Sequence, residues 1–129
     1  MPLMQKYSVD VWNAGHIHDY QSTWPVCFNP ETGTSAICKD GAGKAIHNFV
    51  EPKGLVHVTE GNGGVPGVVG TSTLNANCSS ATAEWCRSHG TGGAYGRWIA
   101  NSTHLTYEHV QNNGGEVTDT FTIWQPSRH

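Results

Sequence analysis

Two histidines near the start of the chain have the type and spacing of metal ligands. The tetrapeptide Gly15-His16-Ile17-His18 closes an apolar run that begins at Val9. Side chains two residues apart on an extended chain point to the same side, and a glycine lets the backbone turn sharply beside a ligand. Neutral imidazole suits zinc, iron and manganese. The pattern predicts metal binding by His16 and His18, although two nearby histidines are more commonly surface or hydrogen-bonded core residues.

The spacing of residues in the sequence does not identify further metal ligands beside these two histidines. The candidate carboxylates are Asp10, Asp19, Glu60, Glu108 and Asp119. None forms a pair with metal-ligand spacing, so each is expected to be a solvated side chain. Three other histidines lie on expected strands and are expected to be structural: His57, His104 and His109.

A glycine-rich tetrapeptide is a second candidate site. Gly61-Asn62-Gly63-Gly64 could form an amide nest for phosphate, but it lacks the Lys-Ser/Thr ending of a P-loop. A tight turn is the preferred interpretation.

Four cysteines form two local pairs, Cys27 with Cys38 and Cys78 with Cys86. An even count with local spacing is typical of disulfides in secreted proteins. Four cysteines allow three connectivities, of which local pairing is preferred. The alternative is four free thiols, including a zinc role, but neither pair has the C-x-x-C spacing of a zinc knuckle.

Two glycosylation sequons also favour a secretory compartment. They predict glycans on Asn77 and Asn101. The first six residues contain no charged region followed by an apolar region, so they do not form a signal peptide. Together these features favour the C-terminal piece of a longer secreted protein, with Met1 an internal methionine.

Composition favours strands and excludes some partners. The 129 residues include 16 glycines and only 10 acidic and 7 basic residues. Low charge with much Gly, Asn, Ser and Thr indicates short strands joined by turns. The chain has no Lys/Arg cluster and no apolar stretch near the ~18–20 residues that span a bilayer. We therefore expect neither nucleic acid nor a membrane as partner.

The elements that must position the histidines are mostly strands. A helix end is expected at 2–7, and strands at 8–14, 55–59, 95–100, 104–110 and 116–125. Asn112-Asn113-Gly114-Gly115 can supply the positive φ angles of a hairpin turn between the last two strands. Residues 19–26 are expected to lead away from the first strand. Residues 27–53 and 65–93 are expected to be loop insertions, irregular over 71–94 apart from a helical turn near 81–85.

These residues resemble a known family. The stretch from Lys6 to Tyr20, KYSVDVWNAGHIHDY, resembles the last metal-ligand block of the purple acid phosphatases, which are secreted, binuclear, calcineurin-like metallophosphoesterases. The match continues in further segments: 23–26, 54–59 with the glycines after it, 95–97, 101–105 and the hairpin ending near Trp124. It covers most of the chain, interrupted at 27–53 and 65–93.

The resemblance implies a fold and a chemistry. The fold would be α+β and strand-dominated: the C-terminal part of a two-sheet metallophosphoesterase sandwich, with a terminal β-hairpin and little helix. Residues 1–129 would form a single partial domain. His16 would bind the divalent ion and His18 the ferric ion of a binuclear centre, iron with zinc, manganese or iron, that hydrolyses phosphate monoesters in the complete protein.

The chain departs from the family pattern. It has no Gly-Asp-x-x-Tyr and no Gly-Asn-His-Glu block, and Gln21-Ser22 replaces the family's Glu-Arg. The resemblance therefore predicts a fragment that is inactive alone, binds metal at most partially, and self-associates through exposed sheet edges. Two alternatives are a non-catalytic secreted β-rich binding or structural module derived from the family, and a small independent histidine–metal protein.

Overall fold

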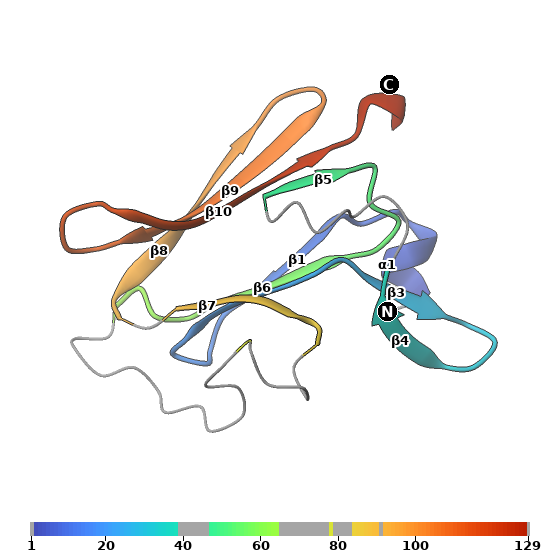
Figure 1. The fold of residues 1–129 in the computed structure, drawn as a ribbon, viewed down its shortest axis with the longest axis horizontal. Coiled ribbons are helices and arrows are strands. Elements are labelled where there is room, and N and C mark those ends of the chain that lie inside the picture. The colour runs from blue at the N-terminus through green and yellow to red at the C-terminus, as the bar shows by residue number, and fades with distance from the viewer. Residues whose placement is uncertain (1, 39–46, 65–77, 79–83, 91, 129) are drawn as a thin grey trace.

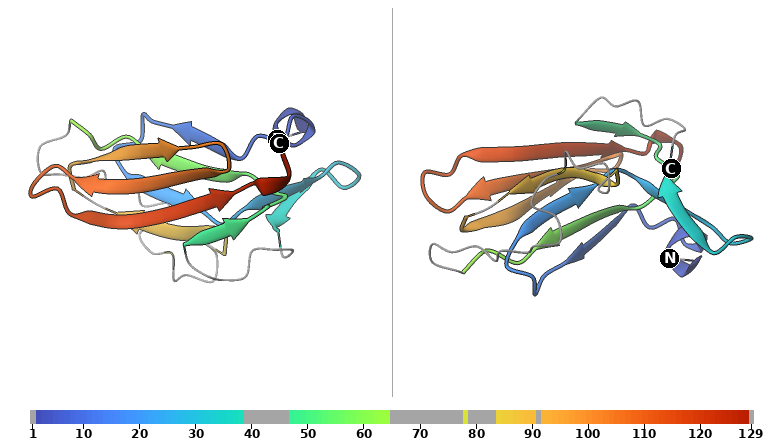
Figure 2. Two further views of the ribbon diagram at one scale, coloured as in Figure 1. Left: turned by 90° about the horizontal axis from the view of Figure 1, so that it is seen from above. Right: turned by 60° about the horizontal axis from the view of Figure 1, so that its bottom comes forward.

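Two β-sheets stacked face to face make up most of the molecule (Figures 1 and 2). The structure is a computed structural model that describes residues 2–38, 47–64, 78, 84–90 and 92–128. Within these residues, helix is confined to α1 (Pro2–Lys6) and the 3-10 turn η1 (Pro126–Arg128). The expected strand-dominated fold with little helix is confirmed.

The first sheet carries the candidate histidines at the end of one of its edge strands. Its order is β1-β6-β2-β7, with β1 parallel to β6 and β2 antiparallel to both of its neighbours. The strands are β1 (Val11–Ala14), β6 (Val56–Glu60), β2 (Tyr20–Thr23) and β7 (Cys86–Gly90). Val56 and Val58 alternate with exposed His57 and intermediate Thr59, so β6 turns one apolar face to the second sheet.

The second sheet contains the terminal hairpin. Its order is β5-β10-β9-β8, antiparallel except for the β5–β10 pair. The strands are β5 (Asn48–Val50), β10 (Val117–Trp124), β9 (His104–Gln111) and β8 (Ala94–Ala100). The hairpin turn contains Gly114 at φ 86° and Gly115 at φ 68°, the left-handed conformations that glycine adopts without a steric cost. The hairpin expected from the sequence is confirmed.

Both sheets contribute to one core. The core cluster combines residues of the first sheet with residues of the second: Tyr20, Val56, Val58, Phe49, Tyr107, Phe121 and Ile123. Trp24, Val11, Trp98 and Leu105 pack around it. Because the core lies between the layers, the outer face of the first sheet is left open, and Trp12 on β1 is 44% exposed.

A small hairpin projects from the end of the molecule that holds α1 (Figure 1). It consists of β3 (Val26–Asn29) and β4 (Thr34–Ile37), and the Cys27–Cys38 disulfide closes it. A Cβ added to Gly54 would lie 2.0 Å from the Cys38 sulfur, so a side chain at this position would collide with the bridge. The second disulfide joins Cys78 to Cys86. The preferred local pairing is thus the one that the structure contains.

Several expectations about secondary structure were wrong. Residues 19–26 do not simply leave the first strand, because they include the central strand β2. Residues 86–90, expected to be irregular, form the edge strand β7, and the 27–53 segment contributes β4, β5 and most of β3. These strands lack apolar alternation of their own and are held by pairing to neighbours. The helical turn expected near 81–85 lies mostly outside the described residues.

Candidate functional site

The candidate ligands His16 and His18 occupy an exposed loop directly after β1. Because β1 and β6 are parallel, the loop lies at the edge where both strands end. His16 has φ 80°, a left-handed conformation that is rare for a residue with a side chain. Such an outlier costs of order 1–3 kcal/mol and often marks a functional position.

The loop is held against the residue that follows β6. The Asp19 backbone N–H donates to the Ile17 carbonyl at 2.7 Å, and the Gly61 N–H donates to the Asp19 carbonyl at 3.1 Å. A Cβ on Gly61 would lie 1.9 Å from the Ile17 oxygen, so only glycine permits this approach. The glycine-rich segment after β6 therefore supports the histidine loop.

Asp19, expected to be solvated, is buried. Only 4% of it is exposed. Its Oδ1 accepts a hydrogen bond from the Tyr20 backbone N–H at 2.8 Å, and its Oδ2 accepts one from His89 Nε2 at 2.9 Å. A buried carboxylate is tolerated because these bonds replace its hydration. The first carboxylate after the histidines thus fixes the loop internally.

The histidine pair fits part of a metal centre. Both imidazoles are accessible from solvent and have the donor chemistry of iron, zinc and manganese ligands. Among the residues that the structure describes, no three His, Cys, Asp or Glu side chains gather into a group that could hold a metal ion. The described part of the chain therefore offers two candidate ligands, and a complete metal centre would need others.

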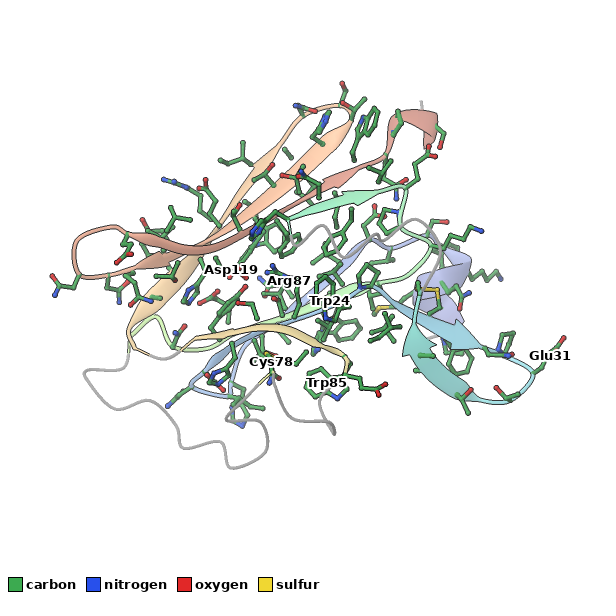
Figure 3. All side chains as sticks on the ribbon, viewed as in Figure 1. Trp24, Glu31, Cys78, Trp85, Arg87 and Asp119 are labelled. Atoms are coloured by element: carbon green, nitrogen blue, oxygen red, sulfur yellow. A yellow bond between two sulfur atoms is a disulfide. The ribbon has the colours of Figure 1, made fainter. Side chains whose placement is uncertain are left out.

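A cluster of polar side chains joins the two sheets behind this loop. Asp119 of β10 accepts hydrogen bonds from the Tyr20 hydroxyl of β2 and from Arg87 of β7. Figure 3 shows Arg87 and Asp119 side by side between the sheets, and their side chains are only 1% and 7% exposed. Burial, with the Asp119 charge second, raises the pKa of Tyr20 far above its usual value. Tyr20 is therefore a neutral donor.

A second part of the cluster lies beside the first. The Tyr107 hydroxyl donates to Glu60, whose other oxygen lies 3.7 Å from His109 Nε2. His109 stacks on Tyr20 with ring centroids 3.9 Å apart. Burial raises the pKa of Glu60, partly opposed by the Tyr107 bond, and burial lowers the pKa of His109, partly opposed by Asp119. Both groups are pushed toward their uncharged forms.

Sequence reasoning missed this cluster, although a signal was present. Glu60 and Asp119 were expected to be solvated, and both are largely buried. Period-two alternation places Glu60 on the face of Val58 and places Asp119 on the face of Phe121. The alternation of side chains along each strand could therefore have predicted that both carboxylates face the core. The expectation that His109 is structural agrees with its buried position, whereas His57 and His104 are exposed.

Of the two asparagines in glycosylation sequons, the structure describes only Asn101. Asn77 lies outside the described residues. Asn101 is exposed in the turn between β8 and β9, where its Oδ1 accepts bonds from the Thr103 and His104 backbone N–H groups. A glycan on Asn101 would point to solvent from a defined turn.

Comparisons with known proteins find relatives of this chain. A family model described as iron/zinc purple acid phosphatase-like protein C matches residues 54–120. An acid phosphatase of Aspergillus ficuum is 30% identical over 128 residues, covering 97% of this chain and 19% of that protein. A protein of Arabidopsis thaliana named probable inactive purple acid phosphatase 27 is 29% identical over 127 residues, covering 98% of this chain and 18% of that protein.

A solved structure has the same fold. The purple acid phosphatase PPD1 from yellow lupin (Lupinus luteus) seeds superposes with a TM-score of 0.73 at 27% identity, over 98% of this chain and 19% of that one. The chain thus spans about a fifth of the length of these relatives. In the part of the chain that the structure describes, no helix is long and apolar enough to cross a membrane.

Proposed function

Because the chain belongs to the iron/zinc purple acid phosphatase-like family, we propose that it is the C-terminal segment of a longer metallophosphoesterase and supplies two metal ligands. His16 and His18 are those ligands. The observation that carries the proposal is the accessible histidine pair on a strained loop, held by Gly61 and Asp19. Within the described residues this pair has no further ligands around it, so the proposed centre would take its remaining ligands from side chains outside the described residues.

The open surface of the first sheet is a second argument for the proposal that the chain is part of a longer protein. A groove of about 510 Å³ runs along its outer face, lined mainly by apolar side chains that include Met4, Trp12, Leu55 and Trp85. Strand β1 is an edge of the sheet, with Trp12 beside the groove. An apolar face and an unpaired edge are features that proteins normally cover. We infer that the remainder of the longer protein covers them.

The proposed reaction is hydrolysis of a phosphate monoester. A bound pair of metal ions, iron with zinc, manganese or iron, would supply Lewis-acid stabilisation of the charge that develops on the phosphoryl group. This chain's residues orient the ligands. The left-handed backbone at His16 and the hydrogen bonds of Asp19 fix the backbone positions from which the two imidazole side chains extend. The phosphate monoester is the proposed substrate of the complete protein.

We also propose that the protein is secreted and carries a glycan on Asn101. Two disulfides and the exposed asparagine turn support this. Thr103→Ala removes the sequon and leaves the Thr103 backbone donor in place. After expression through a eukaryotic secretory pathway, endoglycosidase should change the mass of the wild type at this site and leave the variant's site unaffected. An unmodified wild-type Asn101 would contradict the proposal.

The first test of the proposed function uses the 129-residue chain itself. We expect no hydrolysis of p-nitrophenyl phosphate with added iron, zinc or manganese, and weak zinc binding that the double variant His16→Ala/His18→Ala abolishes. The matched control is His104→Ala, which removes an exposed histidine far along the chain and should leave zinc binding unchanged. Turnover that depends on His16 would show that the chain is a complete enzyme.

The second test asks whether the chain can complete a metal centre. The corresponding C-terminal fifth of the Aspergillus ficuum acid phosphatase is replaced by this chain, and the secreted, monomeric chimera is assayed. We expect phosphatase activity that falls by at least ~100-fold in the His16→Ala chimera, since loss of a ligand exceeds the 10–100-fold cost of losing its support. Activity that survives removal of both histidines would contradict the proposal.

A further inference from the structure

A carboxylate and an imidazole form a pair directly behind the exposed histidine loop. Asp19 follows His18 in the chain, and its Oδ2 accepts the 2.9 Å hydrogen bond from His89 Nε2. His89 belongs to β7, and its side chain is 17% exposed. The pair therefore links the start of β2 to a strand that comes about seventy residues later.

Asp19 uses each of its polar groups. Its side chain accepts from Tyr20 and His89, its backbone N–H donates to Ile17, and its carbonyl accepts from Gly61. These four bonds reach the loop itself, β2, β7 and the end of β6. A single buried residue thereby connects the loop to three strands of the first sheet.

The loop needs such a connection because its conformation is costly. His16 stays at φ 80° although its side chain disfavours that region. A strained backbone persists only where the surrounding structure over-determines it. The loop is exposed from Gly15 to His18, so little side-chain packing restrains it. The hydrogen bonds of Asp19 and the close approach of Gly61 are the restraints that the structure shows.

We propose that Asp19 and His89 are positioning residues that hold the loop carrying His16 and His18 in its ligand-presenting conformation. The purpose of this arrangement rests on the proposed function, whereas the restraint itself is a property of the fold. In this scheme Asp19 makes no contact with substrate. It acts through the backbone of the loop, and His89 acts by fixing the Asp19 carboxylate.

The first experiment measures the restraint without any metal. The Tyr20 and Gly61 amides both donate hydrogen bonds to Asp19. Their hydrogen exchange is compared with that of the Tyr107 amide, which lies in the core strand β9 and serves as the reference for global unfolding. Asp19→Ala should speed exchange at Tyr20 by at least ~10-fold relative to Tyr107, because the side-chain acceptor of that amide is lost. Exchange at Gly61 should also rise, because its acceptor is the Asp19 carbonyl and the loop that carries this carbonyl loses its side-chain restraints. Asp19→Asn, which keeps an acceptor oxygen, should stay near the wild type. Glu31→Ala, on the distant hairpin (Figure 3), is the control and should change neither amide.

A second variant keeps the inference testable if Asp19→Ala does not fold. His89→Leu leaves the Asp19 backbone bonds intact and removes only the imidazole, and His89→Gln retains a side-chain donor. His89→Leu should accelerate exchange at Tyr20 and Gly61, and His89→Gln should restore part of the protection. Unchanged exchange in His89→Leu would overturn the proposal.

A third measurement separates this inference from the proposed function. Zinc titration should show affinity ~10–100-fold lower in His89→Leu than in the wild type, as for other residues that orient metal ligands. If the chimera keeps its phosphatase activity without both histidines but exchange changes as expected, the proposed function fails and the positioning role stands. If zinc binds equally to both proteins and exchange is unaltered, the positioning role is wrong and the ligand role stands.

Discussion

At the scale of single residues, buried polar side chains decide the properties of this chain. Asp119 pairs with Arg87, and Glu60 bonds to Tyr107, between two sheets that also bury Phe121 and Val58. Such groups stabilise a fold only while each stays paired, because an orphaned buried charge costs several kcal/mol. Glu60 differs from Asp119 in having no cation bonded to it among the described contacts. Its burial instead favours the neutral acid.

Glu60 should make the stability of the chain depend on pH. Burial raises the pKa of Glu60 above its usual 4.5, so between these two values the folded state holds a proton that the unfolded state has lost. The free energy of unfolding contributed by Glu60 therefore falls as pH rises above 4.5 and levels off above the folded pKa. Glu60→Gln cannot ionise and should lose this fall.

The measurement is urea unfolding of wild type and Glu60→Gln between about pH 4 and about pH 7. The variant's stability relative to the wild type should increase with pH over this window. Glu31→Gln, an exposed glutamate on the small hairpin, is the matched control and should give a flat difference. A flat difference for Glu60→Gln as well would show that Glu60 does not titrate abnormally.

At the scale of elements, short strands far apart in the chain complete both sheets. Strand β5 has only three residues, yet it pairs in parallel with the end of β10 and places Phe49 in the core. Strands β2 and β7 bring Tyr20 and Arg87 to Asp119. The sequence did not predict strands β2, β5 and β7. A strand that is very short or mostly polar has no hydrophobic pattern that distinguishes it from a loop.

Phe49→Ala should show that β5 belongs to the core. Phe49 is 0% exposed and packs near Trp24 and Phe121, so its removal should lower the free energy of unfolding by about 3–5 kcal/mol. Val50→Ala on the same strand removes an exposed side chain and should cost within about 0.5 kcal/mol. Chemical denaturation measures both. Equal, small effects would mean that 47–50 is a surface loop.

At the scale of the whole molecule, each of the two sheets ends, among the described residues, in edge strands that pair on one side only. Strands β1 and β7 are the edges of the first sheet, and β5 and β8 those of the second. Exposed backbone donors and acceptors on such strands can pair with another chain. The apolar groove beside Trp12 also favours association, because association would bury its apolar side chains. Self-association therefore remains our prediction for the isolated segment.

Sedimentation velocity tests that prediction. The 129-residue chain should form dimers or larger species as its concentration rises, and Trp12→Lys should shift the distribution toward monomer because a charge at the β1 edge opposes pairing. Leu3→Lys on α1, which also replaces an exposed apolar residue, should have little effect. A wild type that stays monomeric at every concentration would contradict the prediction.

The sequence by itself determined the local features of this protein. The histidine motif, the local cysteine pairs, the glycine turn at Gly114 and the apolar alternation of β6, β9 and β10 all depend on residues close together in the chain. Each has a local physical cause, such as strand periodicity or the left-handed freedom of glycine. These features were enough to indicate the strand-dominated fold and the family.

Only the tertiary structure decided which distant residues meet. It paired Asp19 with His89 and buried Asp119 against Arg87, and it placed Gly61 where a side chain would collide with the Ile17 carbonyl. Local sequence could not predict these contacts, because a charged side chain is stable inside only when a particular partner, brought by another strand, replaces its water. The sequence predicts His16 and His18 as ligands, and the packing of the sheets decides how the loop that carries them is held.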